Sequence, residues 1–239
     1  MKFSLVFTLL LFVQIAAKAQ IVAGEPSNFE STSQILDVIE DKLNKDKVIN
    51  YDLKDVVGSP YLLHEFLPGT MYLGKKNYGE FLFRYNIYRD EVELKASLTD
   101  PIESIKKING VSIELENGTL LEVANVKNEN TIERKFLIQL SADGKYKLAK
   151  NVYVEFDIPK EADTPLSSNK RAKFIKYEDY YIFNTKINSF IKVGKKKKEI
   201  LKLFPNNVDA IEGFIANNKL NLKSEKDLIS LFDFLNTSI

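Results

Sequence analysis

The sequence predicts an α+β protein: a mostly antiparallel β-sheet of about eight strands, an N-terminal helix, and a C-terminal cap of two or three short helices. Apolar and polar residues alternate over much of residues 60–193, which is the period of strands with one buried face. After Gly194 the apolar spacing becomes helical, over residues 195–236. Strands gathered in one part of the chain and helices in another are typical of the α+β class, whereas a doubly wound sheet alternates them.

The first 20 residues predict an export leader. Lys2 gives a positive start, residues 3–17 are almost wholly apolar, and Ala17-Lys18-Ala19 fits a small-x-small cleavage site. An apolar run of about 15 residues is shorter than the roughly 20 that cross a bilayer as a helix. We therefore expect residues 1–19 to be a signal peptide cleaved after Ala19, and the mature chain to be periplasmic or secreted.

The mature chain is expected to begin with a flexible segment, residues 20–30, and to form a single domain over residues 31–239. Residues 34–44 carry apolar side chains near helical spacing, behind serines that suit a helix N-cap. They are Ile35, Leu36, Val38, Ile39 and Leu43. This segment is the predicted N-terminal helix.

Three hairpins are predicted to follow. Residues 81–88 and 92–98 alternate about a turn at residues 89–91. Residues 112–115 and 119–126 flank Asn117-Gly118, and Asn-Gly favours the positive φ values of a tight hairpin turn. The third hairpin joins residues 136–140 and 146–148 about Asp143-Gly144, and another strand, residues 152–158, ends before Pro159.

The C-terminal third is predicted to contain a surface loop, two strands and the helical cap. The loop spans residues 160–172, and the strands span about residues 174–184 and 187–193. Apolar stripes then recur around Ile200, Ile211 and Leu231. Ser224 with Asp227 three residues later resembles a capping box, in which Glu or Gln is the better partner.

Composition excludes several kinds of chemistry. The chain has no Cys and a single His, His64, so thiol catalysis, iron–sulfur clusters and sites with two imidazole ligands are ruled out. Loss of the leader, which holds Lys2, Lys18 and no acidic residue, changes the net charge from +1 to −1. We therefore expect no cofactor, no metal site, no nucleic-acid partner and no integral membrane segment after cleavage.

His64, next to Glu65, is the weak catalytic candidate, because the pKa of imidazole suits general base catalysis. No Gly-x-Ser-x-Gly motif supplies a nucleophile for it. The carboxylate pairs Glu91/Glu93 and Glu114/Glu116 each share one face of a strand. Such neighbours line up side by side, as on the wet face of a half-buried sheet, and do not face each other across a substrate.

Lys195, Lys196, Lys197 and Lys198 form the densest charge run and are the weak candidates for binding. Lysines at a helix N-terminus oppose the helix dipole. Their contact with an anionic lipid or polysaccharide surface, within residues 192–202, is one interpretation. A solvated corner in which the lysine stems cover apolar surface is the other.

Two aromatic clusters, around Phe81 and around Tyr177, also allow both a binding and a structural interpretation. The first adds Phe83, Tyr85 and Tyr88, and the second adds Tyr180, Tyr181 and Phe183. Aromatic side chains in strands usually fill a core, although exposed rings can also stack on sugars or bases. We expect these rings to lie in the core.

The chain resembles a broad group of exported proteins from Bacteroidota. The resemblance rests on Ala17-Lys18-Ala19 before Gln20, on residues 58–61 followed by residues 84–88, and on the tail from Tyr180 to Asn236. It implies export to the periplasm and transfers no functional residue.

These observations favour an exported, soluble envelope protein that acts as a non-catalytic binding module, with an envelope protein as a possible partner. Two alternatives stay open. One is a hydrolase that uses His64 or surface carboxylates, and the other is a peripheral membrane or polyanion binder that acts through residues 192–202.

Overall fold

The computed structural model describes residues 39–40, 56–141, 144–157 and 171–238. The predicted leader, the flexible segment 20–30, most of the predicted helix 34–44 and nearly all of the loop 160–172 lie outside these residues. No helix within the described ranges is long and apolar enough to cross a membrane.

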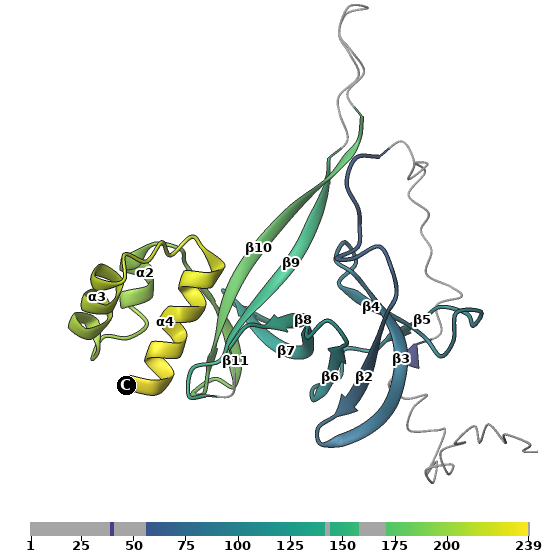
Figure 1. Cartoon of the computed structure of the whole chain (residues 1–239), viewed down its shortest axis with the longest axis horizontal. Helices are drawn as coiled ribbons and strands as arrows, with labels where there is room; N and C mark the ends of the chain where they lie inside the picture. The colour runs from purple at the N-terminus through teal and green to yellow at the C-terminus, as the bar shows by residue number, and fades with distance from the viewer. Residues whose placement is uncertain (1–38, 41–55, 142–143, 158–170, 239) are drawn as a thin grey trace, which may run out of the picture.

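Six strands form the N-terminal half of one continuous sheet (Figure 1). They pair antiparallel in the order β1-β5-β4-β3-β2-β6. Their bounds are β1 Ile39–Glu40, β2 Leu67–Leu73, β3 Lys76–Asn86, β4 Glu91–Lys95, β5 Glu103–Ile105 and β6 Val111–Leu115. The predicted turn at Asn117-Gly118 joins β6 to the next strand, and Gly118 has a φ of +81° there.

The next five strands close into a barrel. They are β7 Leu120–Asn128, β8 Thr131–Gln139, β9 Leu148–Asp157, β10 Lys173–Asn184 and β11 Ser189–Val193. Consecutive strands pair antiparallel, and β11 returns to pair with β7, which completes the ring. The closing pair, Phe190 with Val126 and Ile191 with Lys127, is parallel.

The α+β class is confirmed at this coarse level, but the expected number of about eight strands is wrong. The described residues form eleven strands. The two strands predicted at 146–148 and 152–158 are replaced by one strand, β9, which runs unbroken from Leu148 to Asp157 because Asn151 faces inward and keeps the alternation in phase. The predicted helix 34–44 is wrong at Ile39–Glu40, which pair as β1 with the open edge of β5.

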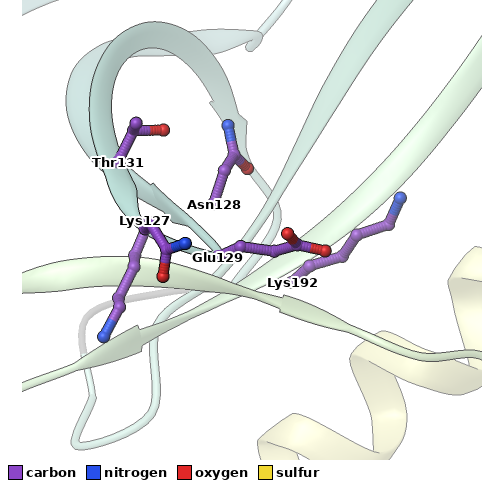
Figure 2. Close-up of a pocket in the computed structure, with 6 residues that line it drawn as sticks. Lys127, Asn128, Glu129, Thr131 and Lys192 are labelled. Carbon is purple, nitrogen blue, oxygen red and sulfur yellow. The ribbon is translucent and has the colours of Figure 1, made fainter.

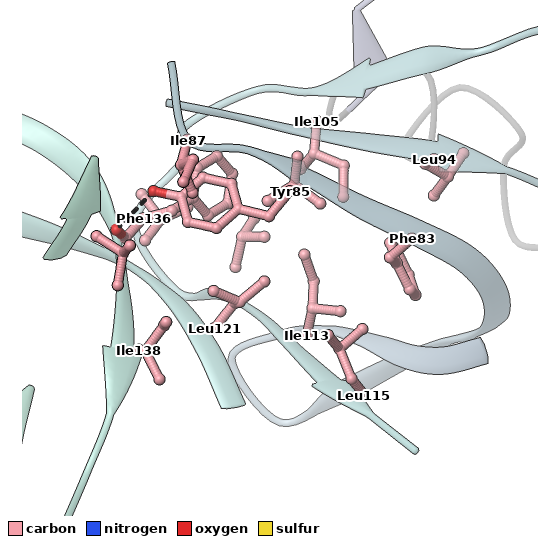
Figure 3. Close-up of a cluster of buried hydrophobic side chains, with 14 of the residues drawn as sticks. Phe83, Tyr85, Ile87, Leu94, Ile105, Ile113, Leu115, Leu121, Phe136 and Ile138 are labelled. Atoms are coloured by element: carbon pink, nitrogen blue, oxygen red, sulfur yellow. Dashed lines mark hydrogen bonds between the residues drawn. The ribbon is translucent and has the colours of Figure 1, made fainter. Parts of the chain in front are cut away.

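A large hydrophobic core joins the N-terminal strands to the outside of the barrel (Figure 3). Phe83 and Tyr85 of β3 and Ile113 of β6 pack in one cluster with Leu121 of β7 and Phe136 of β8. All five are at most 3% exposed. The Tyr85 hydroxyl also donates to the Phe136 carbonyl oxygen at 3.2 Å, so a hydrogen bond links the two parts as well.

Three helices lie within the predicted region 195–236: α2 Lys197–Leu201, α3 Val208–Asn217 and α4 Glu225–Ser238. They form a second core with Leu148, Tyr180 and Val193, which point outward from the barrel strands. The Ser224 hydroxyl accepts a hydrogen bond from Asp227 N at 3.4 Å, as the capping pattern predicts. The Asp227 carboxylate accepts from Asn221 N at 2.8 Å instead of returning to the cap residue.

Candidate functional site

The interior of the five-stranded barrel is apolar in the middle and polar at one end. A compact apolar cluster fills the middle, formed by Ala124, Val126, Leu137, Ala149, Tyr181 and Phe190. Along each strand, alternate residues point inward, so the next inward positions above this cluster are Asn128, Lys135, Asn151, Asp179 and Lys192. Closure of the barrel has therefore turned what resembles a wet sheet face into the wall of a cavity.

These inward residues line a pocket of about 380 Å³ at the polar end. Its wall is completed by Tyr153 of β9, Tyr181 of β10 and the β3–β4 turn, residues 87–90. The turn can approach because β8 and β9 pair only at Ile138–Lys150 and Gln139–Ala149. A pocket of this volume falls in the range of small-ligand sites.

Asp90 fixes the β3–β4 turn against the barrel. Its carboxylate accepts hydrogen bonds from the Tyr85 hydroxyl at 2.8 Å, from Phe136 N at 3.2 Å and from Lys107 Nζ at 2.6 Å. The hydrogen bond from Phe136 N gives a partner to a backbone N–H of β8 at a position where β9 does not pair with it. Asp90 has a φ of +53°, a left-handed conformation that Asp tolerates better than most residues. The pocket wall on this side is therefore rigidly held.

The charged side chains that line the pocket are Arg89, Asp90, Lys135, Asp179 and Lys192, and several of them form ion pairs. Lys192 Nζ lies 2.7 Å from the Asp179 carboxylate, across the β10–β11 hairpin. Lys135 Nζ lies 3.4 Å from the Glu133 carboxylate on the same strand. The pocket therefore presents no strong net charge to a ligand.

Two tyrosines in the pocket are held in the neutral form. Burial raises the pKa of Tyr181 to about 12, and the carboxylate of Asp179 adds to this shift. Burial also raises the pKa of Tyr153, again with a contribution from Asp179. Both phenols keep their protons at neutral pH, where they serve as hydrogen-bond donors and are poor nucleophiles.

Asn151 is the most informative residue of the site. It is 6% exposed, lines the pocket, and makes no side-chain hydrogen bond to any residue that the structure describes. A buried amide carries two donors and an acceptor, and such groups are almost always hydrogen-bonded. The arrangement leaves this amide available to a ligand or to ordered water.

A second, wider pocket of about 580 Å³ adjoins the first and shares Asn128 and Lys192 with it. Figure 2 shows Lys127, Asn128, Glu129 and Thr131 at the β7–β8 turn, with Lys192 on the neighbouring strand β11. Sequence reasoning placed Lys192 at the margin of the lysine run and Tyr88 and Tyr181 in aromatic clusters, and it proposed no pocket at either place.

The predicted site residues lie elsewhere. His64 is exposed in the loop before β2, and no hydrogen bond joins its side chain to a serine or carboxylate in the described part of the chain. Lys195 to Lys198 are exposed at the start of α2. Lys197 pairs with Glu212 at 2.7 Å, and Lys195 lies over the Tyr180 ring, 5.0 Å from its centre. The structure does not bring the lysine run to the pocket.

The carboxylate pairs differ from one another. Glu114 and Glu116 are exposed, as expected of a wet face. Glu93 is 1% exposed, so its expected place on a wet face is wrong. The reason is Arg84, directly opposite on β3, which donates to the Glu93 carboxylate at 2.9 and 2.6 Å.

The rings of the aromatic clusters differ in how exposed they are. Tyr180 and Tyr181 are both 4% exposed and lie in separate cores, as expected. Tyr177 is 38% exposed and Tyr88 40%, so for these two rings the core interpretation is wrong. Tyr177 stacks on Tyr153 of the neighbouring strand, with ring centres 5.4 Å apart and an interplanar angle of 24°.

Comparison of the chain with protein-family models, with curated proteins and with solved structures found no match. Within the described ranges, no group of three or more His, Asp or Glu side chains is placed to hold a metal ion. The assignment of a function therefore depends on the geometry of the barrel pocket.

Proposed function

We propose that this chain is a non-catalytic binding module that takes a small polar ligand into the polar end of its five-stranded barrel. The observation that carries the proposal is Asn151, a residue only 6% exposed whose amide opens to the pocket and has no hydrogen-bond partner among the described residues. A ligand that supplies a donor and an acceptor here would hydrogen-bond to an amide that no described residue occupies.

The chemistry of the pocket supports binding over catalysis. A general base needs a pKa close to the working pH. The two phenols of the pocket are shifted in the opposite direction, since burial raises the pKa of both Tyr153 and Tyr181. Asp179 is held in an ion pair with Lys192. These groups are suited to recognise a ligand through hydrogen bonds.

The expected cellular setting completes the proposal. If the leader is removed after Ala19, the module acts in the periplasm or outside the cell, where it takes a ligand from the envelope environment. The hydrolase alternative receives less support, because His64 lies away from the pocket; of the region 192–202 in the polyanion alternative, Lys192 lines the pocket but is paired with Asp179, and Lys195 to Lys198 lie away from it.

The experiment is a thermal-shift screen of the mature chain against neutral sugars, uronic acids, amino acids and nucleotides. We expect at least one compound to raise the melting temperature of the native chain. The shift should disappear in Asn151→Leu, which has nearly the same volume but no hydrogen-bonding groups. A chain with Lys195 to Lys198 replaced by Gln is the control and should keep the shift.

Two outcomes would overturn the proposal. One is that no compound of the panel stabilises the native chain. The other is that Asn151→Leu responds as the native chain does, since the ligand would then bind elsewhere. Loss of the response only in the lysine variant would favour the polyanion alternative.

A further inference from the structure

Beside the polar pocket lies an aromatic surface. Tyr153 and Tyr177 are cross-strand partners on β9 and β10, and both point to the inward face of the hairpin. Their rings stack, and Tyr177 is the more exposed of the two, at 38%. Tyr153 belongs to the pocket wall itself. The hydrogen-bonding groups of the pocket and this ring pair therefore form one continuous surface.

The charges of the site restrict the class of ligand. A nucleotide or sugar acid needs cations that are free to meet its anionic groups, and a free amino acid needs a cation and an anion together. Lys192 and Lys135 already face carboxylates, at 2.7 and 3.4 Å. An anionic ligand would have to compete with these carboxylates for the two lysines. A neutral ligand would leave them intact.

The polar groups of the pocket favour a ligand with both donors and acceptors. Asn151 offers an NH₂ group and a carbonyl, and the Tyr181 hydroxyl is a protonated donor, whereas the Tyr153 hydroxyl, which is hydrogen-bonded to Asp179, can still accept from a ligand. Hydroxyl groups act as donor and acceptor at once, so a polyhydroxylated ligand can satisfy these side chains without carrying a charge.

We propose that the ligand is a neutral saccharide, with the C–H face of one sugar ring against the outer face of Tyr177 in the stacked Tyr153–Tyr177 pair and its hydroxyls hydrogen-bonded to Asn151 and the pocket phenols. A sugar ring has an apolar C–H face and a polar rim, which matches an aromatic platform beside amide and phenol groups. This inference rests on the proposed function, because it identifies the ligand of the same pocket.

The test measures affinity for matched neutral and anionic sugars: glucose against glucuronate, and galactose against galacturonate. Titration calorimetry on the mature chain should show binding of at least one neutral sugar, and binding of its uronic acid at least about tenfold weaker. Tyr177→Ala should weaken the neutral sugar about tenfold, which corresponds to about 1.4 kcal/mol. Tyr177→Phe keeps the ring and should bind as the native chain does.

The results separate this inference from the proposed function. If an amino acid, a nucleotide or a uronic acid binds in an Asn151-dependent way and neutral sugars do not, the pocket is a binding site and the saccharide assignment is wrong. If a neutral sugar binds equally to Tyr177→Ala and the native chain, the aromatic platform is refuted. If no compound binds, the proposed function fails together with the inference.

Discussion

Replacing Glu93 should destabilise the protein more than replacing any exposed acidic residue. The Glu93 side chain is 2% exposed and the Arg84 side chain 17%. The Arg84 guanidinium lies 3.9 Å from the centre of the Tyr61 ring and 4.4 Å from that of Phe66. In Glu93→Ala this cation would stay buried between the two rings without its counter-charge.

The magnitude follows from the geometry of the pair. Removal of one partner of a buried ion pair costs about 3–5 kcal/mol, because the remaining charge is left without compensation. Glu93→Gln keeps the volume and one acceptor, so we expect a smaller loss of about 1.5–3 kcal/mol. Glu114→Ala, at an exposed position of β6, should stay within about 0.5 kcal/mol of the native chain.

The assay is equilibrium unfolding in urea, with the free energy of unfolding taken for each variant. The double variant Arg84→Met/Glu93→Leu removes both charges and should recover most of the stability lost in Glu93→Ala. If Glu93→Ala were no less stable than Glu114→Ala, the reasoning on this buried pair would be refuted.

Two further predictions concern pH and the docking of the last helix. The pKa of Tyr181 is raised to about 12, above the 10.0 of an unperturbed tyrosine, so the unfolded state loses this proton first. The contribution of Tyr181 to the free energy of unfolding should therefore be fully present below about pH 10 and be lost as the pH rises toward about 12. In Tyr181→Phe the urea midpoint should fall less steeply over this pH range. Identical pH profiles of the urea midpoint for both chains would contradict this prediction. Asn236 of α4 accepts a hydrogen bond from Tyr146 N at 2.8 Å and donates one to Tyr146 O at 3.1 Å. Asn236→Ala should therefore lower the free energy of unfolding by about 1–3 kcal/mol and speed amide hydrogen exchange in α4. The control Asn218→Ala, at an exposed site, should change neither quantity.

The hairpins and the helical cap could be predicted because their signals are local. Alternation in β3, the Asn117-Gly118 turn and the stripe around Leu231 each involve residues close in sequence. The parallel pair that closes the barrel joins Val126 to Phe190, which are far apart in the chain and carry no local pattern for pairing. Hydrophobic periodicity therefore could not predict that the barrel closes.

The pocket was missed for a related reason. Polar residues at alternate strand positions, such as Asn128, Asn151 and Asp179, have the same pattern whether the face meets solvent or a barrel interior. Only closure distinguishes the two. Asn151 lies in residues 149–151, which fall between two predicted strands but belong to β9. The sequence signal that could have indicated the pocket was a polar residue within a continuous strand pattern.

The claim that the barrel interior binds the ligand is tested most directly by the side-chain amide of Asn151. In a ¹⁵N-labelled mature chain, addition of the neutral sugar that binds should shift the Asn151 side-chain NH₂ resonances in proportion to occupancy, with smaller changes at Asn236. Saturating sugar that leaves the Asn151 resonances in place, with shifts confined to residues around Lys195 to Lys198, would contradict the account.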